Sequence, residues 1–181
     1  TRNKKMFINK NEKKISDQYL NLGYVIKNID DIDSLEWIRN YFFKIISSIF
    51  PKLKKNKSND ILNNIHKNIN ISDLNKFRLD IFNKINSNKE FREKYYKISK
   101  SLVDIIVGNE IAMQSRINLS IQLPKDDSSL LPIHADTWSG VSPFETVIWL
   151  PLVDCYKTKS MYILPPKKNE ILNKLFLDKK I

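Results

Sequence analysis

Two residues beyond the middle of the chain have the types and the spacing of a metal site. His134 and Asp136 are separated by one residue, and in a strand residues i and i+2 point to the same side. An imidazole and a carboxylate that face one point are two of the three ligands of a 2-His-1-carboxylate triad, which binds Fe(II) and leaves positions open. The same spacing also fits a histidine at the end of a strand, followed by an aspartate that caps a helix or forms a turn. On the spacing alone, both interpretations stay open.

The other histidine and the single cysteine are not expected to bind a metal or to act as a nucleophile. His66 is the second of only two histidines, and its polar helical surroundings predict a surface residue. Cys155 is the single cysteine, and we interpret it as a small structural residue rather than a ligand. The sequence has no cysteine–histidine cluster with zinc spacing and no glycine-rich phosphate loop. We therefore expect no catalytic residue beyond the metal ligands.

A stretch with one polar face leads toward the His134–Asp136 pair. Apolar and polar residues alternate over positions 113–122, which predicts a strand that ends before Pro124. Arg116, Asn118 and Gln122 share the polar face of this strand. Their side chains could contact a substrate or co-substrate, and simple exposure to solvent explains the pattern equally well.

The spacing of apolar residues changes near Gly108. Apolar side chains recur every three or four positions over residues 33–107, which predicts mainly helical structure, and Gly108 stands where a left-handed helix cap belongs. Beyond it, alternation and short apolar runs predict strands. The predicted strands are 113–122, Leu131–Ala135, Glu145–Leu152 and Ser160–Leu164, with one short strand earlier in the chain at Gly23–Lys27.

Helices followed by a run of antiparallel strands predict an α+β fold with a sandwich or jelly-roll core. A chain of 181 residues is long enough for one domain with a sizeable core. We expect residues 1–108 to form its mainly helical part and residues 109–181 to form the first part of its β core.

Composition argues against several classes of protein. The sequence contains no apolar run of 18 residues and no apolar segment behind a basic N-terminus, so we expect neither a membrane span nor a secretory signal. A single cysteine excludes an internal disulfide framework and favours a reducing compartment. These features together predict a cytoplasmic protein.

The net charge of +11 does not by itself indicate a nucleic-acid partner. Lysine outnumbers arginine 26 to 5, and lysine, isoleucine and asparagine are all abundant, as an AT-rich coding sequence would produce. Residues 126–181 carry seven basic and seven acidic side chains, so this part has no net charge. We therefore do not expect a nucleic-acid partner; a nucleic-acid-binding module would need a contiguous basic face and salt-dependent binding.

Several stretches together resemble the Fe(II)/2-oxoglutarate-dependent oxygenases of the phytanoyl-CoA-dioxygenase-like superfamily. The most similar branch is a bacterial one found with carbohydrate-biosynthesis genes, and the resemblance covers most of the chain. The stretches are Gly23–Asn28 (GYVIKN), Asn109–Pro124 (NEIAMQSRINLSIQLP), His134–Asp136 (HAD), Glu145–Asp154 (ETVIWLPLVD) and Ser160–Asn169 (SMYILPPKKN).

The resemblance implies a double-stranded β-helix with flanking helices and an Fe(II) ion bound by His134 and Asp136. It implies 2-oxoglutarate as co-substrate, decarboxylated to succinate as O2 is split, and hydroxylation of a small molecule such as a carbohydrate or nucleotide-sugar. Trp149 matches a strand tryptophan that lines the co-substrate pocket in relatives, although core packing explains it equally well. The residues we assign to co-substrate binding are Trp149, Asn118, Gln122 and Arg116.

The sequence departs from this family in two residues that the chemistry needs. The family has a distal histidine as third ligand and an arginine that pairs with a 2-oxoglutarate carboxylate. No histidine follows His134 and no arginine follows Arg116. We therefore expect a piece of a longer protein, with both residues outside it. The alternative function is a non-catalytic jelly-roll protein that binds a sugar through His134 and Asp136.

The H-x-D pair is local, so its geometry should not depend on distant sequence. We expect the two side chains to lie side by side and to face an open, incomplete cavity. Residues Ser115–Leu123 and Thr146–Leu150 should flank that cavity, with Trp149 near the pair.

Overall fold

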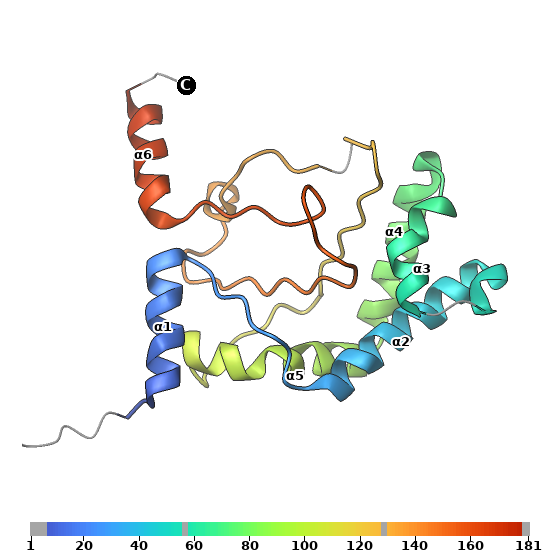
Figure 1. Cartoon of the computed structure of the whole chain (residues 1–181), viewed down its shortest axis with the longest axis horizontal. Helices are drawn as coiled ribbons and strands as arrows, with labels where there is room; N and C mark the ends of the chain where they lie inside the picture. Colours follow the sequence, from blue (N-terminus) through green and yellow to red (C-terminus); the bar gives the residue numbers. More distant parts are fainter. Residues whose placement is uncertain (1–6, 56–57, 128–129, 179–181) are drawn as a thin grey trace, which may run out of the picture. The chain divides into compact units, whose positions relative to one another are not determined.

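The computed structural model describes residues 7–55, 58–127 and 130–178, and over these ranges the chain is mainly helical (Figure 1). The chain folds into two compact units. The first contains the residues up to Asp30, Lys100–Ile111 and the residues from Tyr156 onward; the second contains Asp31–Ser99 and Ala112–Cys155. The α-helices are α1 (Lys10–Leu22), α2 (Ile32–Ile49), α3 (Ser58–Asn64), α4 (Ile71–Ser87), α5 (Lys89–Ile106) and α6 (Pro166–Leu177), with 3-10 turns η1 (Pro51–Lys55), η2 (Ile65–Lys67) and η3 (Asp136–Ser139).

Local capping explains where helix α1 begins and ends. The side chain of Asn9 accepts hydrogen bonds from the backbone N–H groups of Asn11 and Glu12, and the Glu12 carboxylate accepts one from the Asn9 N–H at 2.8 Å. This reciprocal capping box satisfies donors that the first helical turn leaves without partners. Gly23 ends the helix with φ of 77°, a left-handed conformation that favours glycine.

Helix α2 begins at a cap that the side chain of Asp31 provides. Its carboxylate accepts hydrogen bonds from both the backbone N–H and the hydroxyl of Ser34, at 2.9 and 2.7 Å. These bonds, the backbone one first, hold the pKa of Asp31 below its ordinary value. The apolar stripe of the helix then faces inward, which buries Ile38, Phe42, Ile45 and Ile46.

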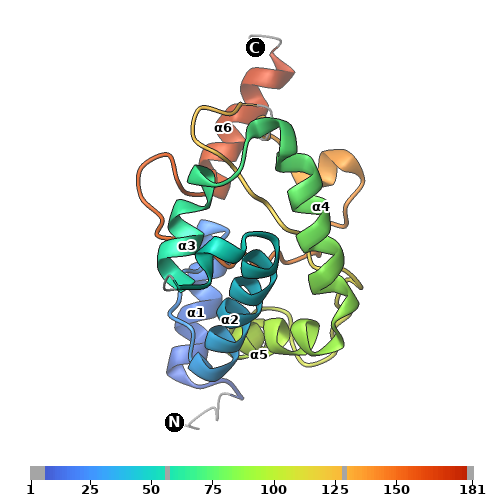
Figure 2. The ribbon, with the colours of Figure 1, turned by 90° about the vertical axis from the view of Figure 1, so that its right-hand side faces the viewer.

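The hydrophobic core of the second unit lies among helices. α2 contacts η1, α3 and α4 (Figure 2). Phe91, at the start of α5, is buried, and its ring lies 5.7–6.3 Å from the rings of Trp37, Tyr41 and Phe42. Such tilted aromatic clusters add specific contacts to the area they bury. The apolar residues that recur at helical spacing along α4, Leu74, Phe77, Ile81 and Ile85, are buried in this core.

The helical part of the prediction for residues 33–107 is confirmed by α2, α4 and α5. Helix α5 ends at Ile106, and Gly108 follows with φ of 103° while its N–H donates to the carbonyl of Val103. The predicted left-handed position after this helix is therefore found where the sequence placed it.

The predicted jelly-roll core is wrong. Over the described residues the chain is 57% helical, and β pairing is limited to one isolated antiparallel bridge between Tyr156 and Lys159. The stretches expected to be strands, Gly23–Lys27, 113–122, Leu131–Ala135, Glu145–Leu152 and Ser160–Leu164, are coil, bends and turns (Figure 1). A period of two predicts an extended, half-buried segment but does not supply the neighbouring strand that a sheet needs.

Helix side chains take the place of that neighbouring strand. In α4, Asn86 donates to the carbonyl of Ile117 at 3.0 Å and accepts from its N–H at 2.7 Å. Arg78 donates to the carbonyl of Ile121, Arg92 to that of Met113, and Tyr95 to that of Ile148. Backbone groups that a sheet would pair therefore bond to helices instead.

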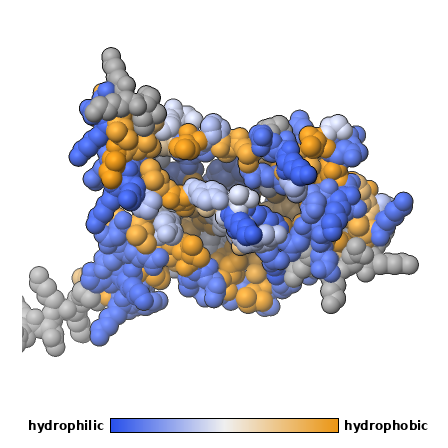
Figure 3. Space-filling model, turned by 45° about the horizontal axis from the view of Figure 1, so that its top comes forward, coloured by the Kyte–Doolittle hydropathy of each residue, from blue (hydrophilic) through white to orange (hydrophobic). Residues whose placement is uncertain are grey.

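Many apolar side chains after Gly108 are exposed. Ile133 is 88% exposed and Phe144 is 90% exposed, whereas the helical core residues are almost fully covered. Figure 3 shows hydrophobic residues in several places on the face that it draws. None of the helices in the described ranges is both long and apolar enough to cross a membrane.

Candidate functional site

His134 and Asp136 lie side by side in the second unit. The Nε2 atom of His134 is 3.6 Å from the Oδ1 atom of Asp136, and their side chains are 45% and 55% exposed. The predicted proximity of the pair is therefore present, although no sheet surrounds it. Both side chains are open to solvent, so a ligand could reach the atoms between them.

A turn after the histidine, rather than a strand, sets this geometry. Ala135 has an extended conformation, with φ of −117° and ψ of 136°, and Asp136 begins the 3-10 turn η3. The N–H of Trp138 donates to the carbonyl of Ala135, and that of Val141 donates to the carbonyl of Asp136. Gly140 ends the turn with φ of 83°. One extended residue between the two side chains is enough to place them on the same side.

A hydrogen bond to the backbone orients the imidazole of His134. Its Nδ1 atom lies 2.7 Å from the carbonyl oxygen of Pro132. A carbonyl oxygen only accepts, so Nδ1 carries the proton and donates. In the neutral ring the lone pair is then on Nε2, the atom nearest Asp136. Metal-binding histidines usually have this arrangement, in which a carbonyl or carboxylate fixes the tautomer.

The pair fits two positions of a metal site. Two ligand atoms that each lie about 2.1 Å from one ion are about 3.0 Å apart at a right angle and about 3.4 Å apart at a tetrahedral angle. The observed 3.6 Å needs only a small side-chain movement to reach this range. Over the described residues, no group of three or more histidine, cysteine, aspartate or glutamate side chains is placed to hold a metal. The pair therefore offers two side chains that could bind a metal, and no third such side chain joins them among the described residues.

The structure does not gather the other predicted site residues at the pair. Arg116, Asn118 and Gln122 are exposed on the extended segment before it, as their alternation predicted. Trp149 is 46% exposed, so it does not belong to the buried core. Neither Arg116, Asn118 nor Trp149 has a hydrogen bond, ion pair or ring contact to the pair. Their assignment to co-substrate binding stays a prediction.

His66 and Cys155, which the sequence did not indicate as ligands, join no metal-binding cluster among the described residues. His66 is in η2 and is partly exposed, and Cys155 is an exposed free thiol whose Sγ lies 3.5 Å from the carbonyl oxygen of Val153. Their neighbours do not complete a metal site in the described ranges.

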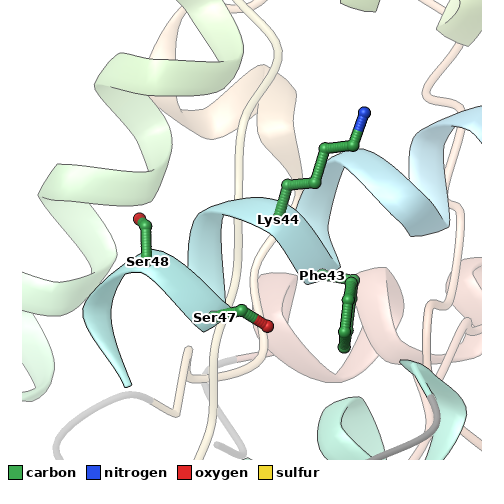
Figure 4. Close-up of a pocket in the computed structure, with 4 residues that line it drawn as sticks. All are labelled: Phe43, Lys44, Ser47 and Ser48. Atoms are coloured by element: carbon green, nitrogen blue, oxygen red, sulfur yellow. The ribbon is translucent and has the colours of Figure 1, made fainter. Parts of the chain in front are cut away.

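A hollow that the sequence interpretation missed lies on helix α2. It has a volume of about 430 Å³ and is lined by Phe43, Lys44, Ser47 and Ser48 (Figure 4). Ser47 is 4% exposed, and its hydroxyl has no hydrogen-bond partner in the described structure. In Figure 4 the Lys44 and Ser47 side chains point in different directions, so no cluster of polar groups converges there. The sequence did contain one sign of this hollow. Ser47 is a polar residue on the apolar face of the helix, next to Ile46.

Comparison with protein-family models, with curated proteins and with solved structures found no match for this chain.

Proposed function

We propose that His134 and Asp136 are two protein ligands of an Fe(II) site in a 2-oxoglutarate-dependent oxygenase that hydroxylates a small molecule, such as a carbohydrate or nucleotide-sugar. The single observation that supports this proposal is the pair itself, with Nε2 and Oδ1 3.6 Å apart and both side chains open to solvent. The jelly-roll fold is not part of the proposal.

The types of the two ligands agree with this metal. Imidazole nitrogen and carboxylate oxygen suit Fe(II), and sites of this kind bind it with positions left open. His134 would bind through Nε2 and Asp136 through a carboxylate oxygen, and iron with bound 2-oxoglutarate supplies the O2-dependent oxidation of a C–H bond. The carbonyl of Pro132 keeps the proton on Nδ1, so the imidazole presents its lone pair on the correct atom.

The exposure of the pair also agrees with a site that admits further ligands. At 45% and 55% exposure, neither side chain is enclosed by the protein. A two-ligand site binds a metal more weakly than a complete triad, so free Fe(II) at the pair would keep most of its coordination positions for water or for 2-oxoglutarate.

Direct metal binding tests this proposal without depending on turnover. Anaerobic titration of the chain with Fe(II), followed by calorimetry, should give binding that His134→Ala and Asp136→Asn each remove. Loss of an outer-shell partner alone often lowers metal affinity roughly 10–100-fold, so loss of a ligand should lower it at least as much. The chain has only two histidines, so His66→Ala is the matched control and should bind Fe(II) like the parent.

A second readout locates the ion. Paramagnetic Mn(II) should broaden the ring signals of His134 in the proton NMR spectrum and leave those of His66 unchanged. Equal broadening of both rings, or unchanged Fe(II) affinity in His134→Ala, would show that the iron assignment is wrong. Carbohydrate binding by metal-free protein, lost in His134→Ala, would instead favour the sugar-binding alternative.

A further inference from the structure

The extended segment 117–123 alternates in exposure as an edge strand does. Ile117 and Leu123 at its ends are buried and the odd-numbered residues between them are half-buried, while the even-numbered residues are exposed. This period of two shows that one face of the segment lies against the rest of the second unit and the other face is in solvent. The exposed residues of the segment are Asn118, Ser120 and Gln122.

One edge of this segment is already occupied by helix α4. Asn86 pairs with both backbone groups of Ile117, and Arg78 donates to the carbonyl of Ile121. In an extended chain, successive residues direct their N–H and C=O groups to opposite edges. The backbone groups of Asn118 and Ser120 therefore face the other edge, and in the described structure neither residue has a hydrogen bond.

The composition of the segment suits pairing with itself. Residues 117–123, INLSIQL, contain no charged side chain, although the chain carries a net charge of +11. A two-fold axis at Ser120 places that residue opposite its own copy, so two backbone hydrogen bonds can be exchanged there. It also places Asn118 opposite the neutral position 122 of the second copy. No like charges meet in this arrangement, and like charges are what commonly prevent edge-to-edge pairing.

We propose that two copies of this chain associate by antiparallel pairing of residues 117–123 across a two-fold axis at Ser120. Such an isologous contact uses the same edge on both copies and closes after two. A second copy is the occupant that fits, because the segment is neutral and complementary to itself within a basic chain.

A charge-exchange experiment at Ser120 tests the pairing. Sedimentation velocity over a series of concentrations should show a dimer for the parent chain. Ser120→Lys and Ser120→Glu should each weaken dimerisation roughly tenfold or more, because like charges then face each other across the axis. An equimolar mixture of the two variants should restore the dimer, since a lysine then faces a glutamate.

Controls separate pairing from folding and from net charge. Thr158→Lys and Thr158→Glu change an exposed polar residue outside the segment and should dimerise like the parent. Circular dichroism should show the same helix content in all variants, because Ser120 is exposed and in no helix. A monomeric parent at every concentration would overturn the proposal, as would single Ser120 variants that dimerise like the parent.

Discussion

Tyr95 shows how one hydroxyl can join a helix to a segment without secondary structure. Its phenol on α5 donates to the carbonyl of Ile148 at 2.7 Å. Burial raises the pKa of Tyr95 from 10.0 to about 12, because the surroundings disfavour the phenolate. The folded state therefore holds this proton more tightly than the unfolded chain does.

We predict that this difference makes the fold sensitive to alkali. Stability from Tyr95 is fully present below pH 10, where the residue is protonated in both states, and is lost as the pH rises toward about 12, where the unfolded state ionises first. In Tyr95→Phe the loss over this window should be smaller, although stability at neutral pH falls by about 1 kcal/mol with the hydrogen bond.

Urea unfolding followed by circular dichroism, repeated at several pH values, measures this effect. Tyr162→Phe is the control, because Tyr162 is exposed and should leave the alkaline loss unchanged. Equal alkaline losses in Tyr95→Phe and the parent would show that Tyr95 does not cause them.

Among the elements, α4 does the most to position a segment after Gly108. Asn86 satisfies the N–H and the carbonyl of Ile117 with a single side chain. Arg78, two turns earlier in α4, donates a hydrogen bond to the carbonyl of Ile121. The extended conformation of residues 117–123 therefore depends on a helix rather than on a sheet.

Removing the Asn86 amide should loosen this attachment. Asn86→Ala leaves two partly buried backbone groups without partners, and we expect a loss of about 1–3 kcal/mol in the free energy of unfolding. Asn75→Ala is the matched control, since Asn75 is exposed on the same helix and alanine is the better helix former. Chemical denaturation compares the two, and similar small changes in both would contradict the attachment.

The glycine that ends α1 has a close neighbour, and this contact can be tested. Gly23 and Gly140 have similar positive φ angles of 77° and 83°, so alanine strains both backbones alike, by about 1–2 kcal/mol. A Cβ atom at Gly23 would also lie 3.3 Å from Cδ of Pro166, whereas at Gly140 it would meet nothing within 4 Å. Gly23→Ala should therefore lower the melting temperature more than Gly140→Ala, and the reverse order would rule out this contact.

Among the described residues, the buried apolar side chains lie mainly in the helices. Phe42 on α2 is 5% exposed, whereas Phe144, in the segment expected to form a β core, is 90% exposed. Exposed apolar side chains of this kind promote association when they are contiguous. The β core expected after Gly108 is thus the clearest difference between the predicted and the observed fold.

Paired truncations test where the core lies. Phe42→Ala should lower the free energy of unfolding by about 3–5 kcal/mol, because it leaves a cavity among packed rings. Phe144→Ala should change it by less than about 0.5 kcal/mol, while lowering the fluorescence of a dye that binds exposed apolar surface. Denaturant unfolding measures both, and a large loss in Phe144→Ala would show that this residue is buried in solution.

Features that depend on neighbours along the chain could be predicted from the amino-acid sequence. The stripes of α2 and α4, the left-handed residue Gly108 and the proximity of His134 to Asp136 all follow from periods of a few residues. A helix forms its backbone hydrogen bonds between residues four positions apart. The spacing of its apolar residues is therefore enough to predict it. The H-x-D geometry needs only one extended residue.

The partners that lie beside each extended segment depend on contacts in the folded chain and could not be predicted from the sequence. An alternating pattern is the same whether its backbone bonds to a strand or, as for Ile117 and Ile148, to side chains of α4 and α5. The exposure of Trp149 and the absence of a third ligand beside His134 in the described chain likewise depend on contacts between distant residues. The alternation of apolar and polar residues does not identify such partners, because the backbone of a strand bonds to another part of the chain or to another molecule.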